Sequence, residues 1–153
     1  MSSDYKESFE QTKIAGSLAA KALDEVTSYV KPGVTTARLD TFCYEFLRDN
    51  GGYSAPLYYR GFPKSSCTSV NHVVCHGIPA DKYLKVGDIV NIDVTSIVNG
   101  WHGDTSRMFF VGDVPIKSKN LVSTTYNSMM KAISIIKNGV RLGDIGDTIQ
   151  TYL

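Results

Sequence analysis

The stretch that decides the fold runs from Asp88 to Phe110 and reads DIVNIDVTSIVNGWHGDTSRMFF. It contains two runs rich in β-branched and aromatic residues, which are joined by Asn99 and Gly100. Asn-Gly is the preferred pair for a two-residue type I′ turn, because both turn residues need a positive φ. The stretch therefore predicts a β-hairpin that turns at these two residues.

The register of this hairpin brings two carboxylates together. The predicted pairs are Val98 with Trp101, Thr95 with Asp104, and Asp93 with Ser106. Because side chains alternate between the two faces of a strand, Asp93 and Asp104 become diagonal neighbours on one face. The polar residues of that face are Asn91, Asp93, Thr95, His102, Asp104 and Ser106. The opposite face carries Val90, Ile92, Val94 and Val98, and is predicted to be core.

Two aspartates on one face of a sheet need a reason, because aspartate is disfavoured in strands. Carboxylates bind divalent cations, and like charges at this separation repel one another without a cation. Asp93 and Asp104 are therefore candidates for a metal site or for acid/base chemistry. A solvated outer face and a structural polar network are the alternatives, and the pattern alone leaves all three open.

The composition is that of a folded globular protein. The chain has 153 residues, of which 42% are hydrophobic and 20% charged, and its net charge is +1. The length predicts a single domain, 1–153, with a sizeable core. The small net charge gives no indication of nucleic-acid binding. The longest uncharged run, Ser65–Ala80, is too polar to be a membrane span, so no membrane association is expected.

The cysteines and the N-terminus indicate an intracellular protein. Cys43, Cys67 and Cys75 are odd in number and form no Cys-x-x-Cys pair, which argues against a disulfide framework or a structural zinc site. The first residues do not resemble a secretory signal. We therefore expect free thiols and a cytoplasmic location.

Hydrophobic spacing predicts four helices around the hairpin. They are expected over residues 8–30, from Thr36 to about Asp49, from Lys117 to Ile136, and from about Leu142. The third is expected to turn Leu121, Thr124, Met129, Ala132 and Ile136 inward. Short strands and loops are expected from Ser54 to Ile78. The last helix has no stop signal before Leu153, which indicates a truncated chain.

Three histidines and one aromatic cluster are further candidates for a site. His76 precedes a Gly-x-Pro turn, where it is either a proton donor or a satisfied turn residue. His102 is a metal ligand, a partner of a ligand, or a bystander. His72 is expected to be a bystander. Tyr58, Tyr59, Phe62 and Cys67 form either an apolar substrate pocket or ordinary core, and neither Cys67 nor Cys75 is expected to be a nucleophile.

Several linked segments resemble the N-terminal half of type 1 (bacterial-type) methionine aminopeptidases. They are 61–65 (GFPKS), 67–71 (CTSVN), 73–79 (VVCHGIP), 87–95 (GDIVNIDVT) and 102–106 (HGDTS). The resemblance implies an α+β "pita-bread" fold, of which this chain would hold the N-terminal half: an antiparallel sheet with helices packed on one face. It also implies a metal-dependent enzyme that removes the initiator methionine from nascent proteins.

The resemblance implies a role for each matching residue. Asp93 is implied as a ligand of one divalent metal ion and Asp104 as a bridge between two, the metal being Co, Mn, Fe, Zn or Ni. His76 is implied to contact the scissile amide. The other residues implied near the substrate or the metals are Tyr59, Phe62 and Cys67 in the methionine pocket, Asn71 and Val73 in a loop that binds a monovalent cation in some members, and Thr95 and His102 beside the ligands.

The match also implies what this sequence lacks. The family takes one histidine and two glutamates as further ligands, and a second catalytic histidine, from its C-terminal half. Activity of the 153 residues alone is therefore not expected. A full-length protein is expected to be a monomer that meets its substrates near the ribosome. The alternatives are a non-enzymatic pita-bread interaction module, an inactive fragment, and an enzyme acting on X-Pro dipeptides.

Overall fold

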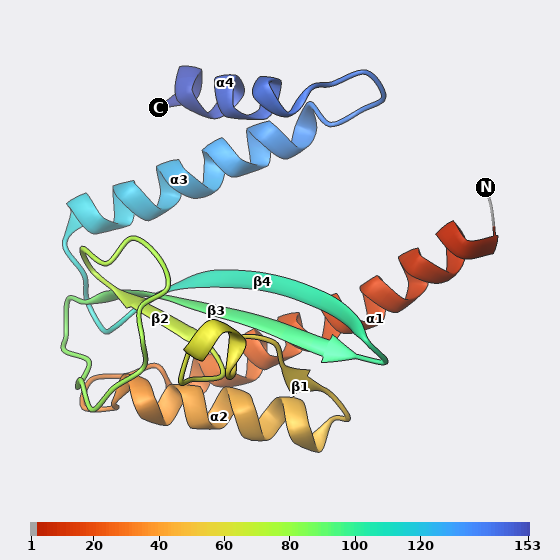
Figure 1. Cartoon of the computed structure of the whole chain (residues 1–153). Helices are drawn as coiled ribbons and strands as arrows, with labels where there is room; N and C mark the ends of the chain where they lie inside the picture. Colours follow the sequence, from red (N-terminus) through yellow and green to blue (C-terminus); the bar gives the residue numbers. More distant parts are fainter. Residues whose placement is uncertain (1–2) are drawn as a thin grey trace. The chain divides into compact units, whose positions relative to one another are not determined.

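A computed structural model describes residues 3–153, which form two compact units: the described residues up to Asp113, and residues 114–153. The first unit contains α1 (Ser3–Val26), η1 (Thr27–Tyr29), α2 (Thr36–Asp49), β1 (Tyr53–Ser54), η2 (Tyr59–Gly61), β2 (Cys67–Val70), β3 (Ile89–Val98) and β4 (Trp101–Phe110). The second contains α3 (Ile116–Ser134) and α4 (Leu142–Tyr152). Figure 1 shows the elements in sequence colours. None of the described helices is long and apolar enough to cross a membrane.

The predicted hairpin forms the centre of an antiparallel sheet. Asn99 and Gly100 have φ of 51° and 82°, as a type I′ turn requires. All three predicted pairs are confirmed: Val98 with Trp101, Thr95 with Asp104, and Asp93 with Ser106. Strand β3 is central, because β4 lies along one of its edges while β1 and β2 share the other.

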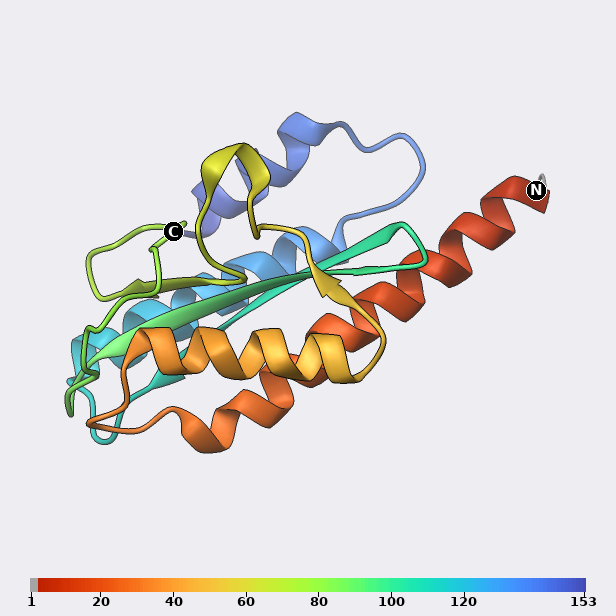
Figure 2. The same cartoon turned by 60° about the horizontal axis from the view of Figure 1, so that its bottom comes forward.

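Helices α1 and α2 cover one face of this sheet (Figure 2). Helix α2 has the predicted bounds, and Thr35 caps it by accepting a 3.1 Å hydrogen bond from the Arg38 amide. Its apolar stripe faces the core: Leu39, Cys43 and Leu47 are buried, and Phe42 and Phe46 are partly buried against them. The core continues into the predicted inner side of the hairpin, where Val90, Ile92 and Val94 are fully buried and Val98 partly so.

The first helix differs from its predicted range of 8–30. Helix α1 begins five residues earlier, at Ser3, and the α-helix ends at Val26, after which η1 forms a 3-10 turn. Its apolar side is buried at Ala15 and from Leu18 to Val26, whereas Phe9 and Ile14 are exposed. The hydrophobic periodicity located the helix, but it did not show that the N-terminal part of the helix is not packed against the sheet.

The second unit corrects one prediction and confirms another. Helix α3 forms close to its predicted range, but Leu121, Thr124, Met129 and Ile136 are exposed and of the five predicted inward residues only Ala132 is buried. Apolar spacing identifies a helix and its stripe, while burial needs a partner surface. Helix α4 begins at Leu142 as predicted.

Candidate metal and substrate site

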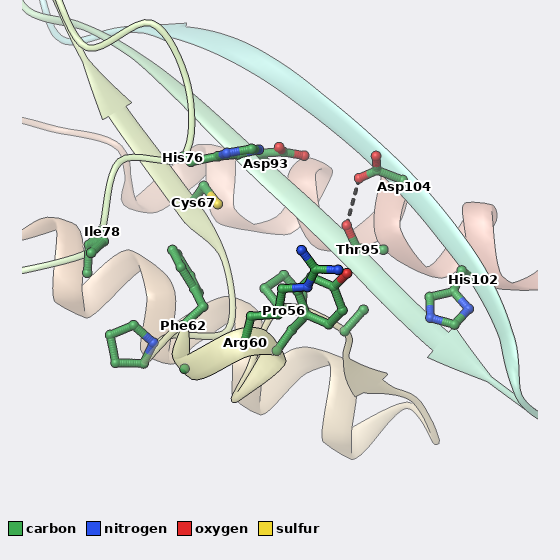
Figure 3. A pocket seen from close by; sticks show the side chains of 14 residues that line it. Pro56, Arg60, Phe62, Cys67, His76, Ile78, Asp93, Thr95, His102 and Asp104 are labelled. Atoms are coloured by element: carbon green, nitrogen blue, oxygen red, sulfur yellow. Dashed lines mark hydrogen bonds between the residues drawn. The ribbon is translucent and has the colours of Figure 1, made fainter.

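The two aspartates of the hairpin lie where the register places them, on the face of β3 and β4 that is turned away from α1 and α2 (Figure 3). Asp93 is partly buried and Asp104 is exposed. Between the strands, the Thr95 hydroxyl donates a 2.8 Å hydrogen bond to Oδ1 of Asp104. The same pairing places Ser106 opposite Asp93, and the Ser106 hydroxyl accepts a 3.3 Å hydrogen bond from Asn91.

The carboxylates face a cavity of about 710 Å³. Its lining combines the hairpin residues Asp93, Thr95, His102 and Asp104 with Cys67, His76, Ile78 and a group from the loop after β1: Ala55, Pro56, Tyr59, Arg60, Gly61, Phe62 and Pro63. The cavity therefore has a carboxylate side and an apolar, aromatic side. That combination is typical of a small-ligand site.

The loop between β1 and β2 builds the aromatic side of the cavity because of how the strands pair. Ser54, the last residue of β1, is opposite Ser96, while Cys67, the first of β2, is opposite Asp93. Only Val94 and Thr95 separate these two points on β3. Residues 55–66 must therefore arch over a gap of two residues, beside the carboxylates.

This loop brings three members of the predicted aromatic cluster to the cavity and leaves the fourth outside it. Tyr59, Phe62 and Cys67 line the cavity, but Tyr58 does not and is 80% exposed. Tyr58 and Arg60 both have positive φ, of 69° and 48°. Such backbone is uncommon for residues other than glycine.

The electrostatics of the carboxylate pair favour a cation. The pKa of Asp93 is raised above its ordinary value, first because burial disfavours the charged form and then because Asp104 repels it. His76 acts in the opposite direction on the same carboxyl. A bound divalent cation would relieve the repulsion between Asp93 and Asp104.

His76 is held at the rim of the cavity by the backbone around Gly77. The φ of His76 is +53°. The next residue, Gly77, is held through both its carbonyl and its amide. The Gly77 carbonyl accepts a 2.8 Å hydrogen bond from the Thr68 amide, and the Gly77 amide donates one of 3.1 Å to the Ser69 hydroxyl. A Cβ on Gly77 would lie 2.3 Å from the Thr68 carbonyl oxygen, so the close approach requires glycine.

The cysteines have the character of buried thiols rather than nucleophiles. Burial raises the pKa of Cys67 to about 11, and the nearby charges of Asp93 and Asp40 add to the effect. Burial likewise raises the pKa of Cys43 to about 12. A thiol with such a pKa is protonated at neutral pH, so Cys67 offers the cavity an apolar, polarizable surface.

The remaining predicted site residues are divided between the cavity and its surroundings. His102 lines the cavity, whereas His72, Asn71 and Val73 are not among its lining residues. The Asn71 side chain is engaged, since it donates to Asp88 at 2.8 Å and accepts from the Ile89 amide at 3.0 Å. The monovalent-cation loop stays a prediction.

Sequence patterns missed Pro56, Arg60 and Ile78, which also line the cavity. Arg60 stacks on Tyr59, with its guanidinium carbon 5.4 Å from the ring centroid. Arg60 directly precedes the matched segment 61–65 and Ile78 lies inside the matched segment 73–79, so these two positions were available as a signal. Which of these side chains line the cavity depends on how the loops fold beside the sheet, which no local pattern of side chains reveals.

The carboxylates of Asp93 and Asp104 are ligands of the type that divalent metal ions prefer. Carboxylate oxygens are preferred ligands of such ions, and the pKa of Asp93 is raised by burial first and by Asp104 second, so a cation would stabilise the charged pair. Within residues 3–153, however, no group of three His, Cys, Asp or Glu side chains is placed to hold one ion together. The described residues therefore offer two carboxylate ligands.

Known proteins share this fold and sequence. The chain is 58% identical to a methionine aminopeptidase from Rickettsia prowazekii (strain Madrid E) over 144 residues. The aligned region covers 94% of this chain and 56% of that protein. The match to the Escherichia coli (strain K12) methionine aminopeptidase is 48% over 149 residues, covering 96% and 56%. The chain thus spans about half the length of the curated relatives it matches.

Solved structures agree with these matches. The crystal structure of methionine aminopeptidase from Rickettsia prowazekii superposes with a TM-score of 0.94 at 57% identity, over 96% of this chain and 59% of that one. A prolidase from Pyrococcus furiosus, at 20% identity and a TM-score of 0.84, shares the fold, over 96% of this chain and 42% of that one. The pita-bread α+β fold predicted from the sequence is therefore confirmed.

A family model covers nearly the whole chain. The model described as "Metallopeptidase family M24" matches residues 10–153. This agrees with the carboxylate pair of the hairpin and with the relatives found by sequence and by structure. The chain belongs to metallopeptidase family M24.

Proposed function

We propose that this chain forms the part of a methionine aminopeptidase that carries the methionine pocket and two of the metal-binding carboxylates. The observation that carries the proposal is one cavity in which Asp93 and Asp104 face Tyr59, Phe62 and Cys67. The 58% identity to a protein named methionine aminopeptidase supports the same choice of substrate.

The carboxylates would hold the metals. Asp93 would be a ligand of one divalent ion and Asp104 a ligand shared by two, and the Thr95 hydroxyl fixes the orientation of Asp104. When bound, the ions lower the pKa of a water molecule and polarise the peptide carbonyl. The ions are Co, Mn, Fe, Zn or Ni. In the family that the chain resembles, one histidine and two glutamates from the following sequence complete the ligand set.

The other residues bind and orient the substrate. The methionine side chain packs against Tyr59, Phe62 and Cys67, where the neutral thiol and the aromatic rings suit a thioether. His76, at the rim, donates a hydrogen bond to the scissile amide as negative charge develops on its carbonyl oxygen. His102 lies at the other end of the cavity, near Thr95 (Figure 3).

The proposed substrate also suggests where the protein acts. Nascent peptides with N-terminal methionine are the substrates, so the protein acts in the cytoplasm near the ribosome, as a monomer. A monovalent cation is held by backbone oxygens at Asn71 and Val73. No part is assigned to nucleic acid or membrane.

The test compares the 153-residue chain with a chimera in which it is joined to the part of the Rickettsia prowazekii enzyme that it does not cover. Methionine release from Met-Ala-Ser is measured with Mn²⁺ or Co²⁺. The chimera is expected to be active, and Asp104→Asn or His76→Ala in the chimera is expected to lower kcat/KM by at least about 100-fold. Asp81→Asn, at an exposed position outside the cavity, is the control.

The outcomes separate the candidate roles. A folded, metal-bound chimera without activity would contradict the enzyme proposal and favour a non-enzymatic interaction module. Release from X-Pro dipeptides in preference to Met-Ala-Ser would contradict the choice of substrate. Activity of the 153-residue chain alone would show that two carboxylates suffice.

A further inference from the structure

A buried carboxylate lies beneath the site and has no part in the proposed chemistry. Asp40 is in the middle of α2 and is 6% exposed. The ion pairs found within residues 3–153 do not include it. Burying a carboxylate without a cationic partner is costly unless hydrogen bonds compensate the lost hydration. The structure must therefore satisfy Asp40 through neutral donors.

One oxygen of Asp40 accepts all of those hydrogen bonds. The donors to Oδ1 are the Ser65 amide at 3.0 Å, the Ser65 hydroxyl at 2.9 Å, the Ser66 amide at 2.8 Å and the Ser66 hydroxyl at 2.8 Å. Two successive backbone amides that converge on one anion fix the direction of the chain between them. Hydrogen bonds to a charged acceptor are also stronger than those between neutral groups.

These bonds attach the end of the loop that forms the cavity wall. The backbone hydrogen bonds within the loop join residues of the range 56–62, and the Ala55 amide donates to the Thr95 carbonyl of β3. The returning arm, residues 63–66, is held instead by Asp40 and by the Ser54 hydroxyl, which donates to the Ser65 carbonyl. Ser54 is the last residue before the loop, so its two ends are tied together at Ser65.

The attachment point is directly next to the substrate side of the cavity. Phe62 precedes the returning arm, Cys67 follows it, and both line the cavity. The charge of Asp40 contributes, after burial and Asp93, to the raised pKa of Cys67, which is consistent with their closeness. A shift of Ser65 and Ser66 away from α2 would move Phe62 and Cys67 relative to the carboxylates of β3 and β4.

We propose that Asp40 is a positioning residue of the substrate pocket, which sets the width of the methionine site by fixing Ser65 and Ser66. The geometry of this attachment stands independently, while its consequence for methionine rests on the proposed function. Asp40 does not touch the substrate. Its acceptor oxygen acts through the returning arm of the loop, so acceptor chemistry rather than side-chain volume decides its effect.

Three variants of the 153-residue chain separate these contributions. Asp40→Asn keeps one acceptor oxygen, Asp40→Leu has a similar shape without an acceptor, and Asp49→Asn changes an exposed carboxylate on the same helix. Amide hydrogen exchange is measured for residues 55–66 and for the hairpin, residues 89–110. Asp40→Leu is expected to speed exchange of 55–66 by about 10- to 100-fold and to leave the hairpin unchanged. Asp40→Asn, which loses the charge but keeps an acceptor, is expected to speed this exchange clearly less than Asp40→Leu does.

Two results would overturn the proposal. Equal behaviour of Asp40→Asn and Asp40→Leu would show that the acceptor is irrelevant, and equal acceleration in the hairpin would show a role in overall stability only. If Asp40→Leu fails to fold, amide hydrogen exchange of the double variant Ser65→Ala, Ser66→Ala tests the proposal instead. It removes two of the four donors, and a rise limited to residues 55–66 is expected, whereas no rise would contradict the proposal.

A binding measurement tests the consequence for the pocket. L-Methioninol is titrated into each chain and followed by backbone amide chemical shifts. Affinity is expected to fall at least about tenfold in Asp40→Leu and to stay within about threefold in Asp40→Asn and Asp49→Asn. Unchanged affinity in a folded Asp40→Leu would contradict the positioning role. If the wild type does not bind methioninol, the proposed methionine pocket fails, while the exchange pattern still decides the role of Asp40.

Discussion

Thr95 and Asp104 face each other across the hairpin and are joined by a 2.8 Å hydrogen bond from the threonine hydroxyl to the carboxylate. The bond links β3 to β4 at the carboxylate side of the cavity (Figure 3). A carboxylate oriented before a metal arrives loses less conformational freedom on binding. Thr95 is therefore expected to matter for metal affinity although its hydroxyl need not touch the metal.

Thr95→Val tests this relationship, because it removes the hydroxyl and nearly keeps the shape. Affinity of the chain for Mn²⁺ is expected to fall about 10-fold or more, as is typical when the partner of a ligand is lost. The measurement is a Mn²⁺ titration followed by water proton relaxation. Thr105→Val, whose side chain is on the opposite face of β4, is the control, and equal losses in both variants would contradict the argument.

Asp93→Asn is expected to stabilise the metal-free chain at neutral pH. The folded pKa of Asp93 lies above its ordinary value of 3.8, so the folded state binds the proton more tightly than the unfolded state does. Stability therefore falls as the pH rises from about 3.8 through the raised pKa. The variant avoids this loss, so its advantage should be present at pH 7 and absent at pH 3.

Urea denaturation at the two pH values, without metal, measures this effect. Asp81→Asn, an exposed position outside the cavity, should show no such pH-dependent gain. Added Mn²⁺ should stabilise the wild type more than Asp93→Asn, because the carboxylate pair binds the ion. A gain that persists unchanged at pH 3 would contradict repulsion and burial as its cause.

Substitution by alanine is expected to have opposite effects on stability at Gly103 and Gly16, where β4 meets α1. A Cβ on Gly103 would lie 2.0 Å from the Gly16 nitrogen, within the backbone of α1. Gly103→Ala is therefore expected to cost about 1–3 kcal/mol of unfolding free energy. A Cβ on Gly16 meets nothing within 4 Å, so Gly16→Ala is expected to gain about 0.5–1 kcal/mol from helix propensity. Urea unfolding measures both, and a similar sign in the two variants would contradict this contact.

The three thiols are expected to react unequally. Burial raises the pKa of Cys43 to about 12 and that of Cys67 to about 11, whereas Cys75 is exposed. Iodoacetamide at pH 8 should therefore modify Cys75 first. Peptide mass spectrometry locates the label, and unfolding in urea, which should equalise the three rates, is the control. Fast labelling of Cys67 in the folded chain would show that the pocket wall opens.

The hairpin shows how much a local sequence rule can predict. Asn99-Gly100 determines the turn, the turn determines the register, and the register places Asp93 and Asp104 on one face. Each step depends only on neighbours in the chain or directly across the hairpin. The same holds for α2, whose bounds follow from the local spacing of its apolar residues.

Other features were not predictable because they depend on contacts between distant segments. The loop of residues 55–66 arches over Thr95 because β1 and β2 share one edge of β3, a pairing that no local pattern encodes. The exposure of Phe9 and Ile14 on α1 likewise depends on where the sheet ends, not on helical periodicity.

The sequence by itself determined the hairpin, its register and the two carboxylates, since these follow from backbone preferences and the alternation of side chains. Only the tertiary structure decided which groups join Asp93 and Asp104: the wall with Phe62 and Cys67, and the attachment of Ser65 and Ser66 to Asp40 on α2. Asp40 is 25 residues from Ser65 in the chain. A bond at that separation exists only after the helix has packed beneath the sheet, because packing energy, and not local preference, brings the two together.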